Sequence, residues 1–168
     1  ILKCLTTQGN GEAGTPRFSH YAFTDISIGF FENAREMFKD IAGRMSFRAL
    51  NVEADLEDQG FSGEQYDVIC AANVIHATKS LDSTLTNMKK LLKPGGILIL
   101  YEMTNTGMIR TGFAFGLLPG WWLSVEDFRE FTPLAAPKDW SNSLKKSGFG
   151  GTNLHIYDFP AHRHQMVS

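Results

Sequence analysis

Two short apolar segments that enclose one amphipathic helix constrain the fold of this chain most. Residues 66–72 and 97–101 have the length and composition of buried strands. Between them, apolar side chains recur on one helical face, at Leu81, Leu85, Met88, Leu91 and Leu92. A strand, a helix and a second strand in succession form a right-handed crossover, so we expect the two strands to be parallel.

The flanking sequence continues this alternation. Upstream we expect a helix end, a strand, a helix and a strand, at residues 1–7, 20–24, 27–43 and 45–52. The helix at 27–43 should bury Phe30, Ala34, Met37, Phe38 and Ile41. Downstream we expect a helix from Pro137 to Gly148 and two closing strands, at 153–159 and 164–167. This order predicts a single α/β domain over residues 1–168, with a Rossmann-like, doubly wound, mostly parallel sheet and an antiparallel edge strand.

The composition is that of an ordinary globular domain. Of 168 residues, 43% are hydrophobic and 20% are charged, and this length can bury one sizeable core. The net charge of −2 offers no basic face to a phosphate backbone, so nucleic acid is not an expected partner. No apolar stretch reaches the roughly 18 residues that cross a bilayer, and Cys4 and Cys70 form no metal-binding pair. We expect a soluble, cytoplasmic protein, and the first residues have the pattern of an excised fragment.

Gly9, Gly11 and Gly14 match the spacing of the dinucleotide-binding motif G-x-G-x-x-G. A functional motif follows a strand, opens a helix and has an acidic residue about 20 positions on. Here the glycines follow an expected helix, and the next acidic residue at a strand end, Asp25, comes too soon. We interpret the segment as a connector, which argues against a nicotinamide-dependent dehydrogenase.

Polar side chains stand at the ends of the expected strands, where ligands of a doubly wound sheet bind. Asp25 could accept both hydroxyls of a ribose, or it could satisfy the first turn of the next helix. Asn51 could bond to an adenine edge, or it could be a turn residue. Residues 113–122 could cover a hydrophobic substrate channel or form packed core, and residues 124–127 have the capping-box pattern of a helix start.

His76 follows the strand at 66–72, and Glu102 follows the strand at 97–101. Adjacent strand ends lie about 5 Å apart, so the two side chains can meet if these strands are neighbours. Histidine suits proton transfer near neutral pH, and a carboxylate bonded to one imidazole nitrogen leaves the other as a base. The alternatives are a structural His–Glu pair or, for His76 alone, a helix cap or surface residue.

Several short segments together form a family pattern. They are Tyr21-Ala-Phe-Thr-Asp-Ile-Ser27, Asn51-Val-Glu-Ala-Asp55, Ala72-Asn-Val-Ile-His-Ala77, Leu92-Lys-Pro-Gly-Gly96 and Leu118-Pro-Gly-Trp-Trp-Leu123. The pattern resembles the C-methyltransferase domains of fungal highly reducing polyketide synthases, which are class I S-adenosylmethionine-dependent methyltransferases. The resemblance covers nearly the whole chain.

The resemblance implies S-adenosylmethionine as the cofactor. Asp25 would hold its ribose, Asn51 and Val52 would flank its adenine, and Asn73 would line the pocket. Domains of this family begin with a strand and a Gly-rich loop that holds the methionine part, and nothing in this sequence matches them. That strand lies between the strand ending at Asp25 and the strand before His76. We therefore expect an N-terminally incomplete fold that is poorly stable alone and binds the cofactor weakly.

The resemblance also implies a reaction. A catalytic dyad of His76 and Glu102 would take the α-proton of a β-ketoacyl thioester carried on an acyl carrier protein, and the α-carbon would then receive the methyl group. The activated donor makes a metal ion unnecessary. The partners would be the carrier-bound substrate and other domains of the same synthase, with no membrane involved. The alternatives are a small-molecule O- or N-methyltransferase and a non-catalytic methyltransferase-like remnant in a megasynthase.

Overall fold

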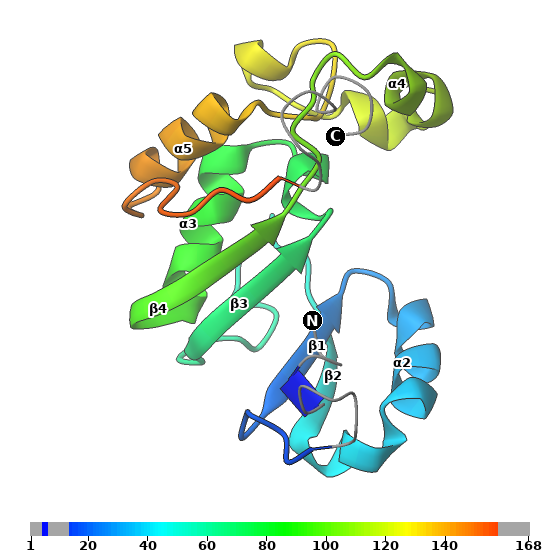
Figure 1. Ribbon diagram of the computed structural model, residues 1–168, viewed down its shortest axis with the longest axis vertical. Helices are drawn as coiled ribbons and strands as arrows, with labels where there is room; N and C mark the ends of the chain where they lie inside the picture. The colour runs from blue at the N-terminus through cyan, green and yellow to red at the C-terminus, as the bar shows by residue number, and fades with distance from the viewer. Residues whose placement is uncertain (1–4, 7–13, 158–168) are drawn as a thin grey trace. The chain divides into compact units, whose positions relative to one another are not determined.

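The structure is a computed structural model that describes residues 5–6 and 14–157. The chain divides into two compact units, Ile1–Asn51 and Val52–Ser168. The strands are β1 (Tyr21–Asp25), β2 (Met45–Ala49), β3 (Tyr66–Ala72) and β4 (Leu92–Tyr101). The α-helices are α2 (Phe31–Met37), α3 (Leu81–Leu91), α4 (Ile109–Phe115) and α5 (Pro137–Lys146) (Figure 1). The 3₁₀ helices are η1 (Ile28–Phe30), η2 (Lys39–Arg44), η3 (Ile75–Ala77), η4 (Pro119–Trp122) and η5 (Asp127–Arg129).

The first unit is a two-stranded parallel sheet with α2 beside it (Figure 1). β1 and β2, both predicted, pair along their whole lengths. The ring of Phe23 in β1 lies 5.6 Å from that of Phe47 in β2 and 6.1 Å from that of Phe31 in α2, between centroids. Because aromatic rings bury much apolar area and pack in preferred geometries, this cluster holds α2 against both strands.

The helix expected at 27–43 is divided into η1, α2 and η2. The expected buried face is confirmed at Ala34 but was wrong at Phe30 and Met37, which are 58% and 63% exposed, while Phe31 is buried instead. Phe31 takes the inward position since its ring contacts both strands. Directly after Met37 the backbone leaves the helical region, with φ −117° and ψ 25°, and this ends the α-helix.

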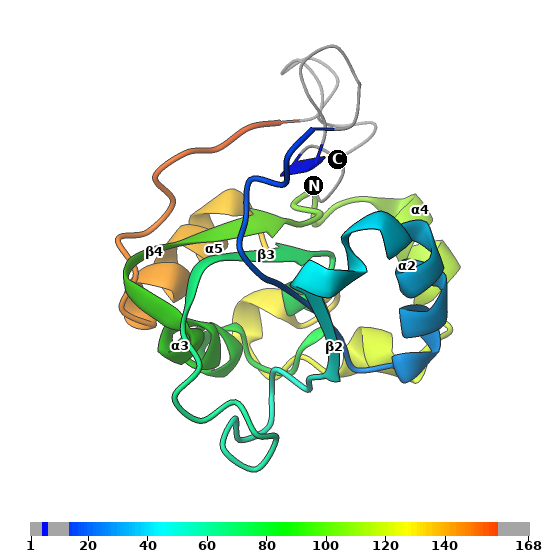
Figure 2. The same cartoon turned by 90° about the horizontal axis from the view of Figure 1, so that it is seen from below.

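The second unit is built on the predicted crossover from β3 through α3 to β4. β3 and β4 are parallel, with one register shift near the start of β3. The predicted face of α3 is buried, at Leu81, Leu85, Met88 and Leu91. α5 lies beside α3 and buries Trp140 and Leu144, as its pattern predicted (Figure 2).

β4 begins directly after α3, with no separate loop. Leu92, expected as the last apolar residue of the helix, is the first residue of the strand. Gly95 has φ 79°, in the left-handed region that glycine enters without steric cost. A Cβ on Gly96 would stand 3.2 Å from the carbonyl oxygen of Asp67, so a side chain there would press against β3. The two glycines thus allow β4 to approach its neighbour closely.

The predicted parallel pairing is confirmed, but the described strands form two sheets, β1–β2 and β3–β4. β3 was expected to be buried on both faces, yet Val68 is 48% exposed, so the described elements leave part of this strand uncovered. Burial raises the pKa of the Cys70 thiol in the same strand.

The antiparallel edge is not seen in the part of the chain that the structure describes. Residues 153–157 form no strand, and there Leu154 and Ile156 are 76% and 78% exposed, so no described element packs on them. Residues 158–168, and with them the last expected strand, lie outside the described residues, as do Gly9 and Gly11.

Among the described helices, none combines the length and apolar character needed to cross a membrane.

Candidate active site

The carboxyl end of β3 is shaped by Asn73, the residue after the strand. Its φ of 52° lies in the left-handed region, which asparagine tolerates better than most residues. Its main-chain N–H donates to the carbonyl of Tyr101 at 2.8 Å, so pairing with β4 continues to this point. The chain then turns into η3, where the completely buried Ile75 anchors the turn.

The structure brings His76 and Glu102 together. Glu102 follows β4, and its Oε1 accepts hydrogen bonds from the main-chain N–H groups of Val74 at 3.2 Å and Ile75 at 2.9 Å. Its Oε2 is hydrogen-bonded to Nδ1 of His76. The side chains of His76 and Glu102 are only 10% and 3% exposed. Because little solvent competes for this contact, it fixes the imidazole more firmly than a surface pair would.

The contact with Glu102 also determines the role of each imidazole nitrogen. An ionised carboxylate can only accept hydrogen bonds, so Nδ1 of His76 is the donor. In the neutral ring the proton is then on Nδ1, and Nε2 has a free lone pair. Within the described residues, Nε2 has no hydrogen-bond partner. The pair is therefore arranged to accept a proton at Nε2 from a bound molecule.

Asp25 and Asn51 lie at the corresponding end of the first unit. Asp25 ends β1, and its carbonyl accepts from the main-chain N–H of Leu50 at 3.0 Å, which places the following Asn51 at the same end of the sheet. The half-buried carboxylate of Asp25 accepts at Oδ1 from the main-chain N–H of Ser27 at 2.8 Å. Oδ1 thus satisfies one main-chain N–H just before η1, as one of the two interpretations predicted, although η1 itself has no side-chain cap, and Oδ2 has no partner among the described residues.

Val52 and Asn73, the remaining predicted site residues, belong to the second unit. The carbonyl of Val52 accepts from Nδ2 of Asn87 in α3 at 3.0 Å, so the main chain at Val52 is tied to the helix. Asn73 is exposed and precedes the turn that carries His76, and its bond to Tyr101 places it next to the Glu102 segment.

The segment after β4 forms the wall of a cavity. α4 and η4 arise from residues whose sequence showed no clear period, and a cavity of about 300 Å³ is lined by residues that include Met108, Ile109, Trp121 and Phe131. Phe113 and Leu117 are 85% and 90% exposed, so packed core does not describe this segment. The lining also includes Thr106 and Thr132, so the cavity offers both polar and apolar contacts.

A buried ion pair beside the dyad was missed by the sequence reasoning. Arg129 is 1% exposed, pairs with Glu126 and donates to the carbonyl of His76 at 2.8 Å. The pattern at 124–127 did indicate a helix start, but η5 has Glu126 rather than Ser124 at its N-cap, without a side-chain cap. No periodicity could show this burial, because the contacts of Arg129 lie about 50 positions away in the sequence.

The family of the chain follows from comparison with known proteins. A family model described as "Methyltransferase domain" matches residues 6–98, more than half of the chain. The chain belongs to the methyltransferase domain family. Highly reducing polyketide synthase 40 of Fusarium mangiferae is 76% identical over the whole chain, and highly reducing polyketide synthase NEC1 of Pyricularia oryzae is 52% identical over 92% of it. The chain spans about 6% of the length of these two relatives.

Solved methyltransferases share the fold. The trans-methyltransferase CalH in complex with SAH matches 84% of this chain with 39% of its own, at 42% identity and a TM-score of 0.77. The CurJ carbon methyltransferase matches 87% of the chain with 39% of its own, at 40% identity and a TM-score of 0.76. The CMeT domain of the citrinin polyketide synthase matches 78% with 33%, at 34% identity and a TM-score of 0.67. This methyltransferase chain therefore has the Rossmann-like fold of class I methyltransferases, as predicted.

Proposed function

We propose that this chain methylates the α-carbon of a β-ketoacyl thioester on an acyl carrier protein, during polyketide synthesis. The observation that carries the proposal is the buried contact between His76 and Glu102, which leaves Nε2 of His76 able to accept a proton. The similarity to carbon methyltransferases and to polyketide synthases supports the same reaction. The cavity beside α4 has apolar side chains in its lining, Met108 and Trp121 among them, against which part of an acyl chain could lie.

The residues at the strand ends fit the adenosine half of S-adenosylmethionine. Oδ2 of Asp25 has no partner among the described residues, so it can accept a ribose hydroxyl while Oδ1 accepts from the main-chain N–H of Ser27. In the same proposal, Asn51 and Val52 flank the adenine and Asn73 lines the pocket. The relative whose structure contains SAH supports this class of cofactor. The sequence has no counterpart of the Gly-rich loop that holds the methionine half in the family.

In the proposed mechanism, His76 takes the α-proton of the substrate at Nε2 while Glu102 holds Nδ1–H and stabilises the imidazolium. The C–H bond breaks, and the two carbonyls that flank the α-carbon share the charge of the enolate. Bound S-adenosylmethionine would supply a methyl group that its sulfonium already activates, so the transfer to carbon needs no metal. General base catalysis of this kind contributes about 10²–10⁴-fold.

We further propose that the chain is one domain that a strand and a Gly-rich loop from an upstream segment would complete. Within the described residues, β1 and β3 each pair with a single neighbouring strand. Strand edges carry main-chain donors and acceptors that need partners, so each sheet has room for another strand.

The test compares this chain with a version extended upstream by one strand and loop. Both are incubated with S-adenosylmethionine and an acetoacetyl thioester, and mass spectrometry measures methyl transfer to carbon. Methylation by the extended version alone is the expected result and supports both proposals. Methylation by both would overturn the need for the added loop. Methylation by neither, although the extended version binds the cofactor, would overturn the assigned substrate.

A further inference from the structure

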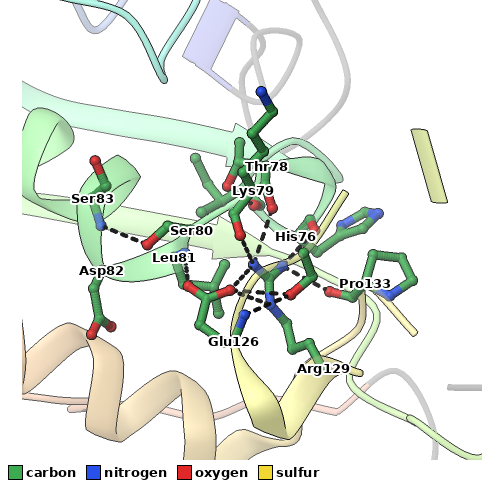
Figure 3. A network of polar contacts seen from close by, with 12 residues as sticks. His76, Thr78, Lys79, Ser80, Leu81, Asp82, Ser83, Glu126, Arg129 and Pro133 are labelled. Atoms are coloured by element: carbon green, nitrogen blue, oxygen red, sulfur yellow. Dashed lines mark hydrogen bonds and ion pairs between the residues drawn. The ribbon is translucent and has the colours of Figure 1, made fainter. Parts of the chain in front are cut away.

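The most deeply buried charge among the described residues is the guanidinium of Arg129, whose side chain is fully buried (Figure 3). It is surrounded by main-chain carbonyls from the segment that carries His76. Nη1 donates to the carbonyl of His76 at 2.8 Å, and Nη2 donates to those of Thr78 at 3.0 Å and Lys79 at 3.1 Å. The segment 76–79 runs from η3 towards the start of α3, so Arg129 holds the main chain between the two helices at three carbonyls.

All five N–H groups of this guanidinium have acceptors. Besides the three carbonyls of 76–79, Nη1 donates to the carbonyl of Pro133 at 3.1 Å, and Nε donates to Oε2 of Glu126 at 3.1 Å. Nη2 also contacts the same oxygen of Glu126. A lysine has three donors on a single nitrogen and cannot reproduce this planar fork. The contacts therefore require arginine rather than a positive charge alone.

Glu126 adds a hydrogen bond at the start of α3. Its Oε1 accepts from the main-chain N–H of Leu81, the first residue of that helix, at 2.6 Å, while Oε2 pairs with Arg129. The main-chain N–H of Val125 donates to the carbonyl of Lys79 at 3.0 Å. Figure 3 shows Glu126 and Arg129 side by side against the segment from His76 to Leu81. Both ends of the link between η3 and α3 are thus held by residues 125–129.

We infer that Arg129 and Glu126 are positioning residues for the base of the methylation reaction. The inference rests on the proposed function, in which His76 is that base. Glu102 holds the imidazole of His76 and the N–H groups that precede it, whereas Arg129 holds the carbonyl of His76 and those that follow. With both sides held, Nε2 has one position relative to the substrate. A misplacement of about 1 Å in such a group can lower a rate about 10²-fold.

The same pair connects the base to the cavity wall. Pro133, whose carbonyl accepts from Arg129, follows Phe131 and Thr132, and these two residues line the cavity beside α4. Filling the cavity with an acyl chain would therefore press on a segment that Arg129 joins to His76.

The experiment measures kcat and KM for an acetoacetyl thioester with the upstream-extended version of the chain and four variants of it: Arg129→Lys, His76→Ala, the two combined, and Arg35→Lys. Arg35 is the matched control, because it pairs with Glu32 at the same spacing of three residues but is 50% exposed. We expect Arg129→Lys to lower kcat about 10²-fold, with KM and cofactor affinity nearly unchanged. Arg35→Lys should leave all three unchanged.

The variant that combines Arg129→Lys with His76→Ala shows whether Arg129 positions His76 or only supports the fold. If Arg129 acts through His76, Arg129→Lys lowers kcat far less in the His76→Ala background than in the parent. Loss by the same factor in both backgrounds, or no loss in the parent, overturns the inference while the base assignment stands. Full activity of His76→Ala overturns the proposed function and this inference with it. If Arg129→Lys does not fold, Glu126→Gln, which retains an oxygen acceptor, is tested in the same cycle with the same criteria.

Discussion

The carboxyl ends of β3 and β1 are built in different ways. At the end of β3, contacts from three segments far apart in sequence enclose the side chains of His76, Glu102 and Arg129, which are 10%, 3% and 0% exposed. At the end of β1, the half-buried Asp25 has one side-chain contact, to the main chain two residues on. Buried groups held by several hydrogen bonds keep one geometry, whereas a carboxylate held by one local bond keeps freedom to meet a ligand. We therefore expect substitutions at the end of β3 to change the rate of methylation. Substitutions at Asp25 should instead change the affinity for S-adenosylmethionine.

The largest expected effect comes from removing the base. His76→Ala should lower kcat about 10²–10⁴-fold, because proton transfer from the substrate then depends on water. The affinity for S-adenosylmethionine should change little. On the upstream-extended version, mass spectrometry measures kcat and calorimetry measures the affinity. His155→Ala is the control, since His155 is an exposed histidine of the same unit. An equal loss in the control, or unchanged kcat in His76→Ala, would contradict the prediction.

A smaller loss is expected for Glu102→Gln. The amide oxygen of glutamine can still accept from the N–H groups of Val74 and Ile75, so the fold and the melting temperature should be kept. Its NH₂ group then faces Nδ1 of His76 as a donor, which favours the tautomer with the proton on Nε2. A ring protonated at Nε2 cannot act as a base, so kcat should fall about 10²-fold. A variant with full activity would show that Glu102 does not select the tautomer.

The contrast between the two strand ends also explains what the sequence could predict. The strands, α3 and the meeting of His76 with Glu102 follow from short-range periodicity and from parallel strand order, which place chain positions 26 residues apart at one edge. The inward turn of Phe31 and the burial of Arg129 depend on which distant groups happen to face them. Such tertiary contacts leave no periodic signal in the sequence. The division of the helix at 27–43 and the hydrogen bonds from Arg129 to segment 76–79 could therefore not be predicted.

Asp25→Asn should affect binding rather than rate. Asparagine keeps an oxygen for the N–H of Ser27, but it replaces the acceptor that we assign to the cofactor ribose with a neutral amide. Loss of a charge-assisted hydrogen bond corresponds to a roughly tenfold weaker affinity for S-adenosylmethionine, with kcat at saturation nearly unchanged. Calorimetric titration of the upstream-extended version measures the affinity. The control is Asp40→Asn, a change at an exposed aspartate of η2. A lower kcat at saturation with unchanged affinity would mean that Asp25 acts on the chemistry instead.

The smallest effect is expected at the amino ends of β3 and β4, where Asp67 and Lys93 form an ion pair at 2.9 Å. The hydrogen bond from Lys93, helped by its charge, holds the pKa of the Asp67 carboxyl below its ordinary value. A carboxyl whose pKa is lower in the folded state stabilises the fold above its unfolded-state pKa, and the contribution disappears as pH falls through the folded-state pKa. Because the two side chains are 80% and 47% exposed, solvent screens the pair and the contribution is small.

Asp67→Asn should therefore lower the melting temperature only slightly at pH 7, and the difference from the parent should shrink as the pH falls from 7 to below the ordinary aspartate pKa. Thermal unfolding followed by circular dichroism between these pH values measures it. A difference that grows as the pH falls would reverse the sign derived from the lowered pKa. A large fall in the melting temperature at neutral pH would mean that this exposed pair constrains β3 as firmly as the buried contacts of His76 do. The distinction between buried and exposed contacts would then no longer hold.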